Sequence, residues 1–316
     1  MLIDNAGEKN LRNITGDNIR FNEPMSRHTS LRAGGPADIF TEPEDIGALI
    51  AIVKWASSEG IPYLIIGGGS NLLVRDNGIR GLVISLKKCL TRITLKSRGT
   101  DLVEVSAGAG ARLQALCSFA IDKGLKGMNF AIGIPGSVGG AIMMNAGTRH
   151  GFMEKVLYSV NFLMPDGKTK KINKADLDFH YRELVWNSGQ DQDTKSRPII
   201  TSGKFLLTPA NPAELKKEAE SFLLERNKKQ PVNMPSAGCF FKNPRSGMTA
   251  GELIDKAGLK GESVGGAGVS REHANFIINR DNASAEDIIT LMEKVRQQVD
   301  THFNILLEPE VEIVGE

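Results

Sequence analysis

The sequence is poor in the residues that mark metal centres and disulfide frameworks. It holds only three cysteines (Cys89, Cys117 and Cys239) and five histidines in 316 residues. The cysteine count is odd and no Cys-x-x-Cys occurs, which argues against a disulfide framework and a thiolate zinc site. The histidines are scattered and never form His-Glu-x-x-His. We therefore expect a reducing environment and no metal site.

Long apolar runs and an excess of one charge are also missing. No apolar run of about 18 residues occurs, so no membrane-spanning segment is expected. The N-terminal stretch 1–13 alternates charges and lacks the apolar core of a signal peptide. Lys and Arg number 39 against 37 Asp and Glu, and no dense basic cluster carries interleaved aromatics. These absences predict a cytoplasmic protein that binds neither membrane nor nucleic acid.

The hydrophobic periodicity predicts an α+β fold with a break near residue 207. Residues up to Ala33 are polar and are expected to form a tail and a first strand. An Asp166-Gly167 turn predicts a hairpin, and Ser284 with Asp287 resembles a capping box. We expect helices at about residues 42–59, 113–123, 212–229 and 285–303, and strands at about 63–66, 81–86, 102–107, 156–164, 168–172 and 305–314.

A glycine loop follows the strand predicted at residues 63–66. Its sequence is Gly67-Gly68-Gly69-Ser70-Asn71, and successive glycine amides of this kind can form an anion-binding nest. No Gly-Lys-Ser/Thr occurs, and a Gly-x-Gly-x-x-Gly motif starting at Gly67 fails at Leu72. The loop is therefore a phosphate cradle of another type or a tight turn.

A second glycine loop, Gly133-Ile134-Pro135-Gly136-Ser137-Val138-Gly139-Gly140, is free of charged residues. Such a loop can line a flat aromatic cofactor or approach a diphosphate through its backbone. Two loops of this kind in one domain suggest a dinucleotide, because its diphosphate needs many donors and its ring needs close walls.

These loops resemble the FAD domain of vanillyl-alcohol-oxidase-type flavoproteins, and within them the UDP-N-acetylenolpyruvoylglucosamine reductase family. The resemblance extends from His28-Thr-Ser-Leu-Arg-Ala-Gly-Gly-Pro36 to Glu308-Pro-Glu-Val311. It includes Pro235-Ser-Ala-Gly-Cys-Phe-Phe-Lys-Asn-Pro244, Ala257-Gly-Leu-Lys-Gly261 and His273-Ala-Asn-Phe-Ile-Ile-Asn279. The segment after Phe205 leaves no room for the insert of the longer family type, so the chain resembles the shorter type.

The resemblance implies a two-part FAD-binding domain and a C-terminal α+β substrate domain. We expect the first FAD-binding part at residues 1–86 and the second at 87–206. The substrate domain is expected at 207–306, and the last strand, 307–316, is expected to return near the flavin.

The resemblance also implies the reaction. In the family, NADPH reduces FAD, and a hydride then reaches the methylene carbon of the enolpyruvyl group on UDP-N-acetylglucosamine. The product is UDP-N-acetylmuramate, a precursor of peptidoglycan. Such chemistry requires a cation for the substrate carboxylate, a proton donor at the neighbouring carbon and a polarising group.

Three residues match these roles by resemblance. Arg182 matches the arginine that steadies the enol carboxylate, and Glu310 matches the acid beside the enolate. Cys239 stands where relatives most often carry the proton-donating serine. A thiol can serve because its reference pKa of about 8.5 makes it the better acid. The competing interpretation of Cys239 is a small buried hydrophobic residue.

Further positions match substrate contacts of the family. Lys229 resembles the lysine that meets the diphosphate, although a lysine at a helix end also complements the helix dipole. Asn243 and His273 match other substrate contacts, and the latter is Gln or His in relatives. Gly268 stands where relatives often have Gln, and the sequence does not reveal what compensates.

Two alternatives remain from the sequence. The first is another flavin oxidase or dehydrogenase that acts on a sugar or alcohol, and the blocks after residue 230 argue against it. The second is a flavin-binding protein without catalysis. Retention of Arg182, Cys239 and Glu310 together argues against it, although a cysteine in place of the usual serine is compatible with a loss of catalysis.

Overall fold

The computed structural model describes residues 5–98, 101–185, 198–245 and 247–316. The chain forms two compact units, each assembled from several segments. Unit 1 comprises Met1–Phe21, Ile39–Gly68 and Gly81–Leu224, and unit 2 comprises Asn22–Asp38, Gly69–Arg80 and Glu225–Glu316. Mixed helices and strands in both units confirm the predicted α+β class. In the described part of the chain, no helix is long and apolar enough to cross a membrane.

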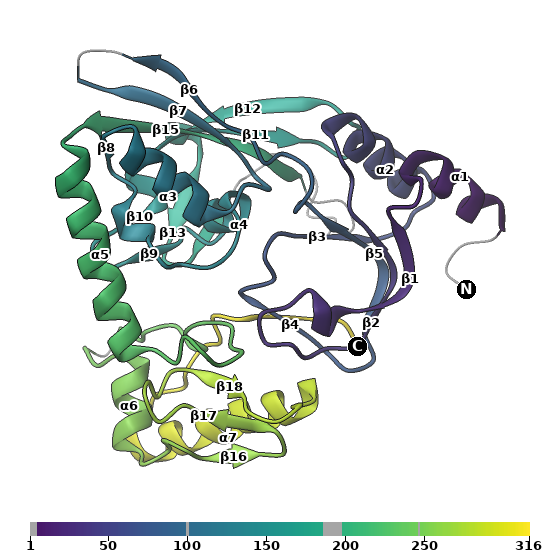
Figure 1. The fold of residues 1–316 in the computed structure, drawn as a ribbon. Coiled ribbons are helices and arrows are strands. Elements are labelled where there is room, and N and C mark those ends of the chain that lie inside the picture. Colours follow the sequence, from purple (N-terminus) through teal and green to yellow (C-terminus); the bar gives the residue numbers. More distant parts are fainter. Residues whose placement is uncertain (1–4, 99–100, 186–197, 246) are drawn as a thin grey trace. The chain divides into compact units, whose positions relative to one another are not determined.

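Unit 1 contains an antiparallel sheet of six strands (Figure 1). Its path is β12-β11-β15-β7-β6, and β8 pairs with the end of β15. The predicted hairpin is confirmed by the antiparallel pairing of β11 with β12. The strands are β6 Ile93–Arg98, β7 Val103–Gly108, β8 Leu125–Lys126, β11 Leu157–Leu163, β12 Thr169–Asn173 and β15 Ile199–Pro209.

Helices and short hairpins complete this part of unit 1. Helix α4 packs against β7 and β15, and α3 packs against α4. The shared core contains Phe162 and Phe205, which are fully enclosed. The elements are α3 Leu113–Asp122, η2 Asn129–Ala131, α4 Val138–Met143, β9 Gly147–Thr148, β10 Gly151–Phe152, η3 Met153–Lys155, η4 Lys174–Asp176, β13 Asp178–His180 and β14 Glu183–Val185.

A four-stranded sheet has the order β1-β2-β5-β3, and β3 and β5 run parallel. Helix α2 begins at an Asp45 cap whose side chain accepts from the Ala48 N–H, and it packs against α1. The elements are α1 Asn5–Thr15, β1 Ile19–Pro24, β2 Pro36–Thr41, α2 Ile46–Ser58, β3 Tyr63–Ile66 and β5 Ile79–Ser85.

The prediction of a polar tail at the N-terminus is wrong, because residues 5–15 form α1. A Glu8–Arg12 pair one turn apart supports the helix from the solvent side. Leu11 is fully buried on the opposite side. Ile14, three residues further on, packs partly buried against the same core. The other residues of the helix are mostly polar or small, which made the stretch resemble a polar tail in the sequence.

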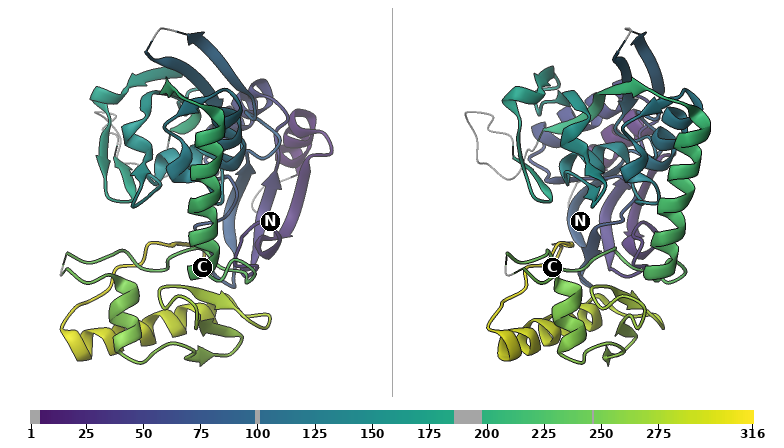
Figure 2. Two further views of the ribbon diagram at one scale, coloured as in Figure 1. Left: turned by 60° about the vertical axis from the view of Figure 1, so that its left-hand side comes forward. Right: turned by 90° about the vertical axis from the view of Figure 1, so that its left-hand side faces the viewer.

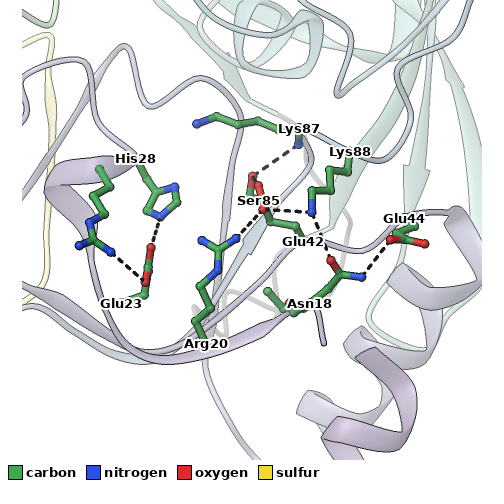
Figure 3. Close-up of polar contacts among 11 residues, drawn as sticks. Asn18, Arg20, Glu23, His28, Glu42, Glu44, Ser85, Lys87 and Lys88 are labelled. Carbon is green, nitrogen blue, oxygen red and sulfur yellow. Dashed lines mark hydrogen bonds and ion pairs between the residues drawn. The ribbon is translucent and has the colours of Figure 1, made fainter. Parts of the chain in front are cut away.

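A buried carboxylate, Glu42, organises the polar contacts beside α1 in unit 1 (Figure 3). Arg20 and Lys88 approach one of its oxygens at 2.9 and 3.7 Å, and the Ser85 hydroxyl donates to the other at 3.3 Å. The cationic partners are half exposed. The two cations and the serine hydroxyl therefore compensate the charge of this buried carboxylate.

Unit 2 contains a three-stranded antiparallel sheet, β16-β17-β18, with α6 and α7 beside it (Figure 2). Both helices begin with complete capping boxes, and the predicted Ser284–Asp287 box of α7 is confirmed. The elements are η1 Met25–Arg27, β4 Leu72–Val74, α6 Ala250–Lys256, β16 Ser263–Val264, β17 Ala267–Val269, β18 Ile277–Asn279, α7 Ala285–Phe303 and β19 Glu312–Val314.

The C-terminal segment is less regular than the predicted strand at 305–314. Only β19 forms a strand, parallel to β4, with Glu312 opposite Leu72. An isolated bridge joins Phe241 to Pro309. Pro309 has no N–H to donate, which interrupts a continuous ladder along this segment.

Helix α5, Pro212–Lys229, follows β15 after two residues, so the predicted helix start is confirmed. The interval Ala210–Asn211 contains no insert. The Asn211 side chain accepts from the Ala213 N–H at 2.9 Å and helps to begin the helix.

Asp76 connects the segment after β4 to helix α7 within unit 2. Its two carboxylate oxygens accept from the N–H groups of Ala285 and Glu286 at 2.8 and 2.9 Å. A carboxylate at a helix N-terminus gains both hydrogen bonds and a favourable interaction with the helix dipole. This contact closes a loop of more than two hundred residues.

We expect Asp76→Asn to lower the free energy of unfolding by about 1–2 kcal/mol, because one charge-assisted bond and the dipole interaction are lost. Ser284→Ala, which removes only the local cap of α7, serves as the matched control and should cost about 1 kcal/mol. Urea unfolding measures both. Equal stability of Asp76→Asn and the parent protein would contradict this role.

Candidate functional site

Parts of the two glycine loops lie in direct contact within unit 1. A Cβ atom on Gly67 would lie 2.1 Å from Ser137 Oγ, and one on Gly68 would lie 2.9 Å from Gly136 Cα. Neither position therefore accepts a side chain without displacing the opposite loop. The structure thus brings together two segments that are nearly 70 residues apart in the sequence.

The start of α3 binds the second loop through hydrogen bonds, and α4 follows the end of the loop. The Gly133 N–H donates to the Gln114 side chain at 3.1 Å, and Leu113 N–H donates to Gly136 O at 3.0 Å. Gly133 and Gly136 have φ of +77° and +116°, which favour glycine. Ile134 and Pro135 lie between these two bends.

The loop then turns into α4. Ser137 caps this helix by accepting from the Gly140 N–H at 3.3 Å. Gly139 packs against Ala109, the residue that follows β7, since a Cβ on Gly139 would lie 2.9 Å from Ala109 Cβ. Glycine at these positions allows α4 to lie close to the sheet.

The remainder of the first loop belongs to unit 2. Gly69 has φ +64° and lies against the His28 carbonyl, which a Cβ would approach at 1.9 Å. Ser70 follows, and the Asn71 amide then donates to the carbonyl of Glu310 at 3.0 Å. The Asn71 carbonyl accepts from the Glu312 N–H at 3.0 Å. The end of the glycine loop is thus tied to the segment that carries Glu310.

The loops fit the dinucleotide cofactor expected from the sequence. Neither contains a charged side chain, and the absence of a Cβ at Gly67 and Gly68 allows the two loops to approach each other closely. In the part of the chain that the structure describes, the N–H groups of Gly68 and Gly136 donate to no protein acceptor. Such amides are suited to an anionic diphosphate.

Arg182 occupies a strained turn in unit 1. It lies between β13 and β14, whose register pairs His180 with Glu183, and its φ is +64°. This left-handed conformation costs a residue with a Cβ about 1–2 kcal/mol. Its Nη1 donates to the Gly147 carbonyl at 2.9 Å, and its guanidinium lies 5.4 Å from the Tyr181 ring centre. An arginine in a position that favours glycine is a strained residue, which the surrounding contacts must hold in place.

Cys239 lies in an irregular segment of unit 2 and is half-buried. Gly238 before it has φ +80°. The following residues are clamped by Asn275, whose carbonyl accepts from the Phe240 N–H at 2.7 Å. The Asn275 amide also bonds both the N–H and the carbonyl of Phe241, at 2.9 and 2.8 Å. These bonds fix the backbone immediately after the thiol.

Glu310 lies beside the same segment. Its N–H donates to the Phe240 carbonyl at 2.8 Å, and the neighbouring Lys242 N–H donates to the Glu308 carbonyl at 2.8 Å. The bridge between Phe241 and Pro309 completes this register. The structure therefore brings the backbones of Cys239 and Glu310 together within unit 2.

Arg226, on the last turns of α5, is a residue that the sequence analysis missed. Burial lowers the pKa of Arg226, and attraction to Cys239 raises it. Among the described residues, its guanidinium makes no hydrogen bond or ion pair. A basic residue three positions before Lys229 carried no distinguishing signal in the sequence.

The other cysteines differ from Cys239. Burial raises the pKa of Cys117 to about 12. Burial and the negative charge of Asp45 raise the pKa of Cys89 to about 11. Both thiols therefore stay protonated at neutral pH and serve as small core residues. In the described ranges, no group of His, Cys, Asp and Glu residues is placed to hold a metal ion.

The three expected substrate contacts lie in unit 2, but their side chains are engaged differently. Lys229 is exposed and pairs with Glu225 at 2.9 Å across one helical turn. Asn243 accepts from the Ala250 N–H at 3.0 Å at the start of α6. Its amide nitrogen donates to no group in the described ranges of the chain.

His273 Nδ1 accepts from the Asn275 N–H at 3.2 Å, so its other ring nitrogen carries the proton in the neutral form. Burial lowers the pKa of His273, and the positive charge of Lys260 lowers it further. The ring edge contacts Phe276 at a centroid distance of 4.9 Å. The imidazole is therefore a neutral donor with a fixed orientation.

Gly268 leaves space that a neighbouring arginine fills. A Cβ on Gly268 would lie 2.5 Å from Cδ of Arg280. A glutamine at position 268 would therefore displace the Arg280 side chain. The glycine and the arginine are coupled, which the separate positions in the sequence did not reveal.

Comparison with known proteins identifies both parts of the chain. Residues 37–173 match the FAD binding domain family. Residues 230–314 match the family described as UDP-N-acetylenolpyruvoylglucosamine reductase, C-terminal domain. These matches confirm the predicted combination of an FAD-binding domain with a C-terminal domain.

Whole-chain relatives carry the same description. A UDP-N-acetylenolpyruvoylglucosamine reductase from Desulfosudis oleivorans is 46% identical over 306 residues, covering 97% of each chain. One from Pelobacter propionicus is 43% identical and covers 96% of this chain and 99% of its own. The crystal structure of UDP-N-acetylenolpyruvylglucosamine reductase from Thermus caldophilus is 34% identical, with a TM-score of 0.78 over 94% of this chain and 100% of that chain. Similarity of this extent, together with the two domain matches, shows that the chain belongs to the UDP-N-acetylenolpyruvoylglucosamine reductase family.

Proposed function

We propose that the protein uses NADPH and FAD to reduce the enolpyruvyl group of UDP-N-acetylglucosamine enolpyruvate to UDP-N-acetylmuramate. The reaction serves the synthesis of peptidoglycan precursors in the cytoplasm. The observation that carries the proposal is the backbone register that joins Cys239 and Glu310 next to the end of the first glycine loop in unit 2. A proton donor and a carboxylate on two neighbouring backbone segments are suited to the protonation of a carbanion.

The glycine loops are the proposed cofactor site. The FAD diphosphate is assigned to the backbone of Gly67–Asn71, and the ring to Gly133–Gly140. The contact between Gly68 and Gly136 and the unpaired amides support this assignment. FAD, when bound, accepts a hydride from NADPH and supplies it to the methylene carbon of the enolpyruvyl group.

The chain's own residues handle the charge and the proton. The Arg182 guanidinium binds the substrate carboxylate, into which negative charge is delocalised after hydride addition. The Cys239 thiol gives its proton to the neighbouring carbon. Glu310 polarises this donor or the enolate beside it. Lys229, Asn243 and His273 hold the UDP-sugar, Lys229 by its charge and the other two as hydrogen-bond donors.

We assign the cofactor and the substrate to the domains expected from the sequence. Residues 1–86 and 87–206 form the two FAD-binding parts, and 207–306 form the substrate part. Residues 307–316 bring Glu310 to the cofactor. The pairing of β19 with β4, directly after the first glycine loop, supports the return of this last segment.

We expect Cys239→Ala to keep FAD and its reduction by NADPH but to slow reoxidation by the enolpyruvyl UDP-sugar about 10²–10⁴-fold. Cys239→Ser should stay active, because an alcohol can also donate the proton. Stopped-flow absorbance of the flavin resolves the two half-reactions.

Cys89→Ala is the matched control, since it removes a fully buried thiol to which no chemical role is assigned. It should lower stability without changing either half-reaction. The parent enzyme should lose activity at high pH as the Cys239 thiol ionises, and Cys239→Ser should lack that loss. Full activity of Cys239→Ala would show that the thiol only packs.

We expect Arg182→Asn to slow reoxidation by the enolpyruvyl UDP-sugar roughly 10²–10³-fold, because a cation for the developing charge is lost. Asparagine tolerates the left-handed turn, so relief of strain offsets the lost bond to Gly147 and stability changes by less than about 1 kcal/mol. Flavin absorbance and thermal unfolding test the two parts. A variant that is strongly destabilised yet fully active would give Arg182 a structural role only.

The lowered pKa of His273 predicts a pH dependence of stability. Unfolded histidine binds a proton near pH 6.5, whereas folded His273 does so only at lower pH. The unfolded state therefore binds more protons in that interval, and the free energy of unfolding falls as the pH drops below about 6.5. His273→Gln should reduce this fall in urea unfolding between pH 8 and pH 5, whereas an unchanged profile would contradict a buried neutral imidazole.

A further inference from the structure

Residues Asn145–Gly147 connect the second glycine loop to the turn of Arg182 within unit 1. They follow the C-cap of α4, Met144, and the N-cap of α4 is Ser137 in that loop. Asn145 itself is buried and has φ +40°, a second left-handed residue close to the strained arginine. A buried polar side chain in such a conformation requires a specific set of partners.

The Asn145 side chain uses both ends of its amide. Its Nδ2 donates to the His180 carbonyl at 3.1 Å, two residues before Arg182. Its Oδ1 accepts from the Glu154 N–H at 3.1 Å, at the start of η3. The first contact holds the strand that enters the arginine turn, and the second anchors the asparagine on the opposite side.

The same short segment also holds the arginine's guanidinium. Gly147, two residues after Asn145, provides the carbonyl that accepts from Arg182 Nη1 at 2.9 Å. A Cβ on Gly147 would lie 2.6 Å from Phe152 Cβ, so this carbonyl is fixed by close packing in the β9–β10 hairpin. The strand that enters the arginine turn and the Arg182 guanidinium are therefore both held by one segment.

That segment is in turn connected, through α4, to the residues that follow β7. The N–H groups of Val138 and Gly139 donate to the carbonyls of Ala111 and Ala109 at 2.9 Å each. The Ala146 N–H donates to the Ala141 carbonyl at 2.8 Å. A chain of backbone bonds thus runs from the second glycine loop through α4 to Asn145.

We propose that Asn145 is a positioning residue that sets the register of Arg182 relative to the second glycine loop. The inference rests on the proposed role of Arg182 in binding the substrate carboxylate. It assigns to Asn145 the task of keeping a strained turn in the one arrangement in which the guanidinium meets the substrate. No direct contact of Asn145 with substrate is involved.

Asn145→Asp isolates this function. Aspartate has the same shape, tolerates the left-handed φ and still accepts from the Glu154 N–H. It loses the donor to the His180 carbonyl. Asn161→Asp is the matched control, because Asn161 donates to Ser202 Oγ at 2.8 Å between β11 and β15, in the same unit and with no bond to the arginine hairpin.

We expect Asn145→Asp to bind FAD and to be reduced by NADPH at the parent rate. Reoxidation by the enolpyruvyl UDP-sugar should slow roughly 10- to 100-fold, the scale expected for a misplaced binding group. The affinity of the oxidised enzyme for the same UDP-sugar, measured by calorimetry, should weaken in parallel. Asn161→Asp should change neither quantity, because its carboxylate can still accept from the Ser202 hydroxyl.

The double variant Asn145→Asp/Arg182→Asn should be no slower than Arg182→Asn alone, because one residue acts through the other. Additive losses would overturn the inference. Parent rates in Asn145→Asp, combined with a slow Arg182→Asn, would also overturn it and leave the role of Arg182 intact. Parent rates in Arg182→Asn would instead overturn the proposed function of the arginine.

If Asn145→Asp does not fold, Asn145→Gly replaces it in the same measurements. Glycine adopts φ +40° without strain and removes both amide bonds. It is held to the same outcomes, namely a slow reoxidation that is not additive with Arg182→Asn.

Discussion

The close packing of Gly67 and Gly68 on Gly136 and Ser137 is the constraint on which the proposed cofactor site depends. Side chains are excluded there by backbone and by a short serine, neither of which can move far. Main-chain atoms therefore form the surface on both sides. A surface made of amides binds an anion through dipoles that need no reorganisation, and it leaves no charged group to compete with the ligand.

The segments next to the proposed reactive side chains, Cys239 and Arg182, are held by asparagine side chains. Two buried asparagines each use a carboxamide to bind main-chain groups of short or irregular segments. Asn275 spans the N–H and carbonyl of Phe241 behind Cys239, and Asn145 joins the His180 carbonyl to the Glu154 N–H beside Arg182. A carboxamide offers a donor and an acceptor at fixed spacing, so it can replace a neighbouring strand where a regular ladder would bury the reactive group. Irregular backbone is thereby kept rigid without being covered.

The sequence predicted the elements that rest on local signals. The strand before Gly67, the hairpin at Asp166-Gly167, the helix beginning at Pro212 and the capping box at Ser284 follow from turn residues, caps and periodicity that act over a few positions. The α1 helix was missed because its two large apolar residues, Leu11 and Ile14, stand in a stretch that is otherwise polar or small. The irregular end of the chain was missed because alternation continues through Pro309, which cannot donate to a ladder.

The geometry of the site needed the structure, since it depends on contacts between distant residues. A left-handed turn is usually marked in a sequence by glycine or asparagine, and neither occurs next to Tyr181-Arg182. In the sequence alone, the buried residues Asn145 and Asn275 cannot be distinguished from exposed asparagines. The pairing of Gly268 with Arg280 involves two residues that are each unremarkable alone. Family resemblance pointed to Arg182, Cys239 and Glu310 but gave no reason for their placement.

The surroundings of Cys239 decide what a thiol can do in place of an alcohol. A thiol is the stronger acid, and a nearby cation favours its ionised form further. Arg226 supplies such a cation, and its attraction to Cys239 is evident in the opposing effect on its own pKa. A proton donor must keep its proton until the carbanion forms, so in the proposed role the cation of Arg226 limits the pH range in which the thiol can act. The attraction to Arg226 favours the thiolate, and therefore works against cysteine as an acid at this position.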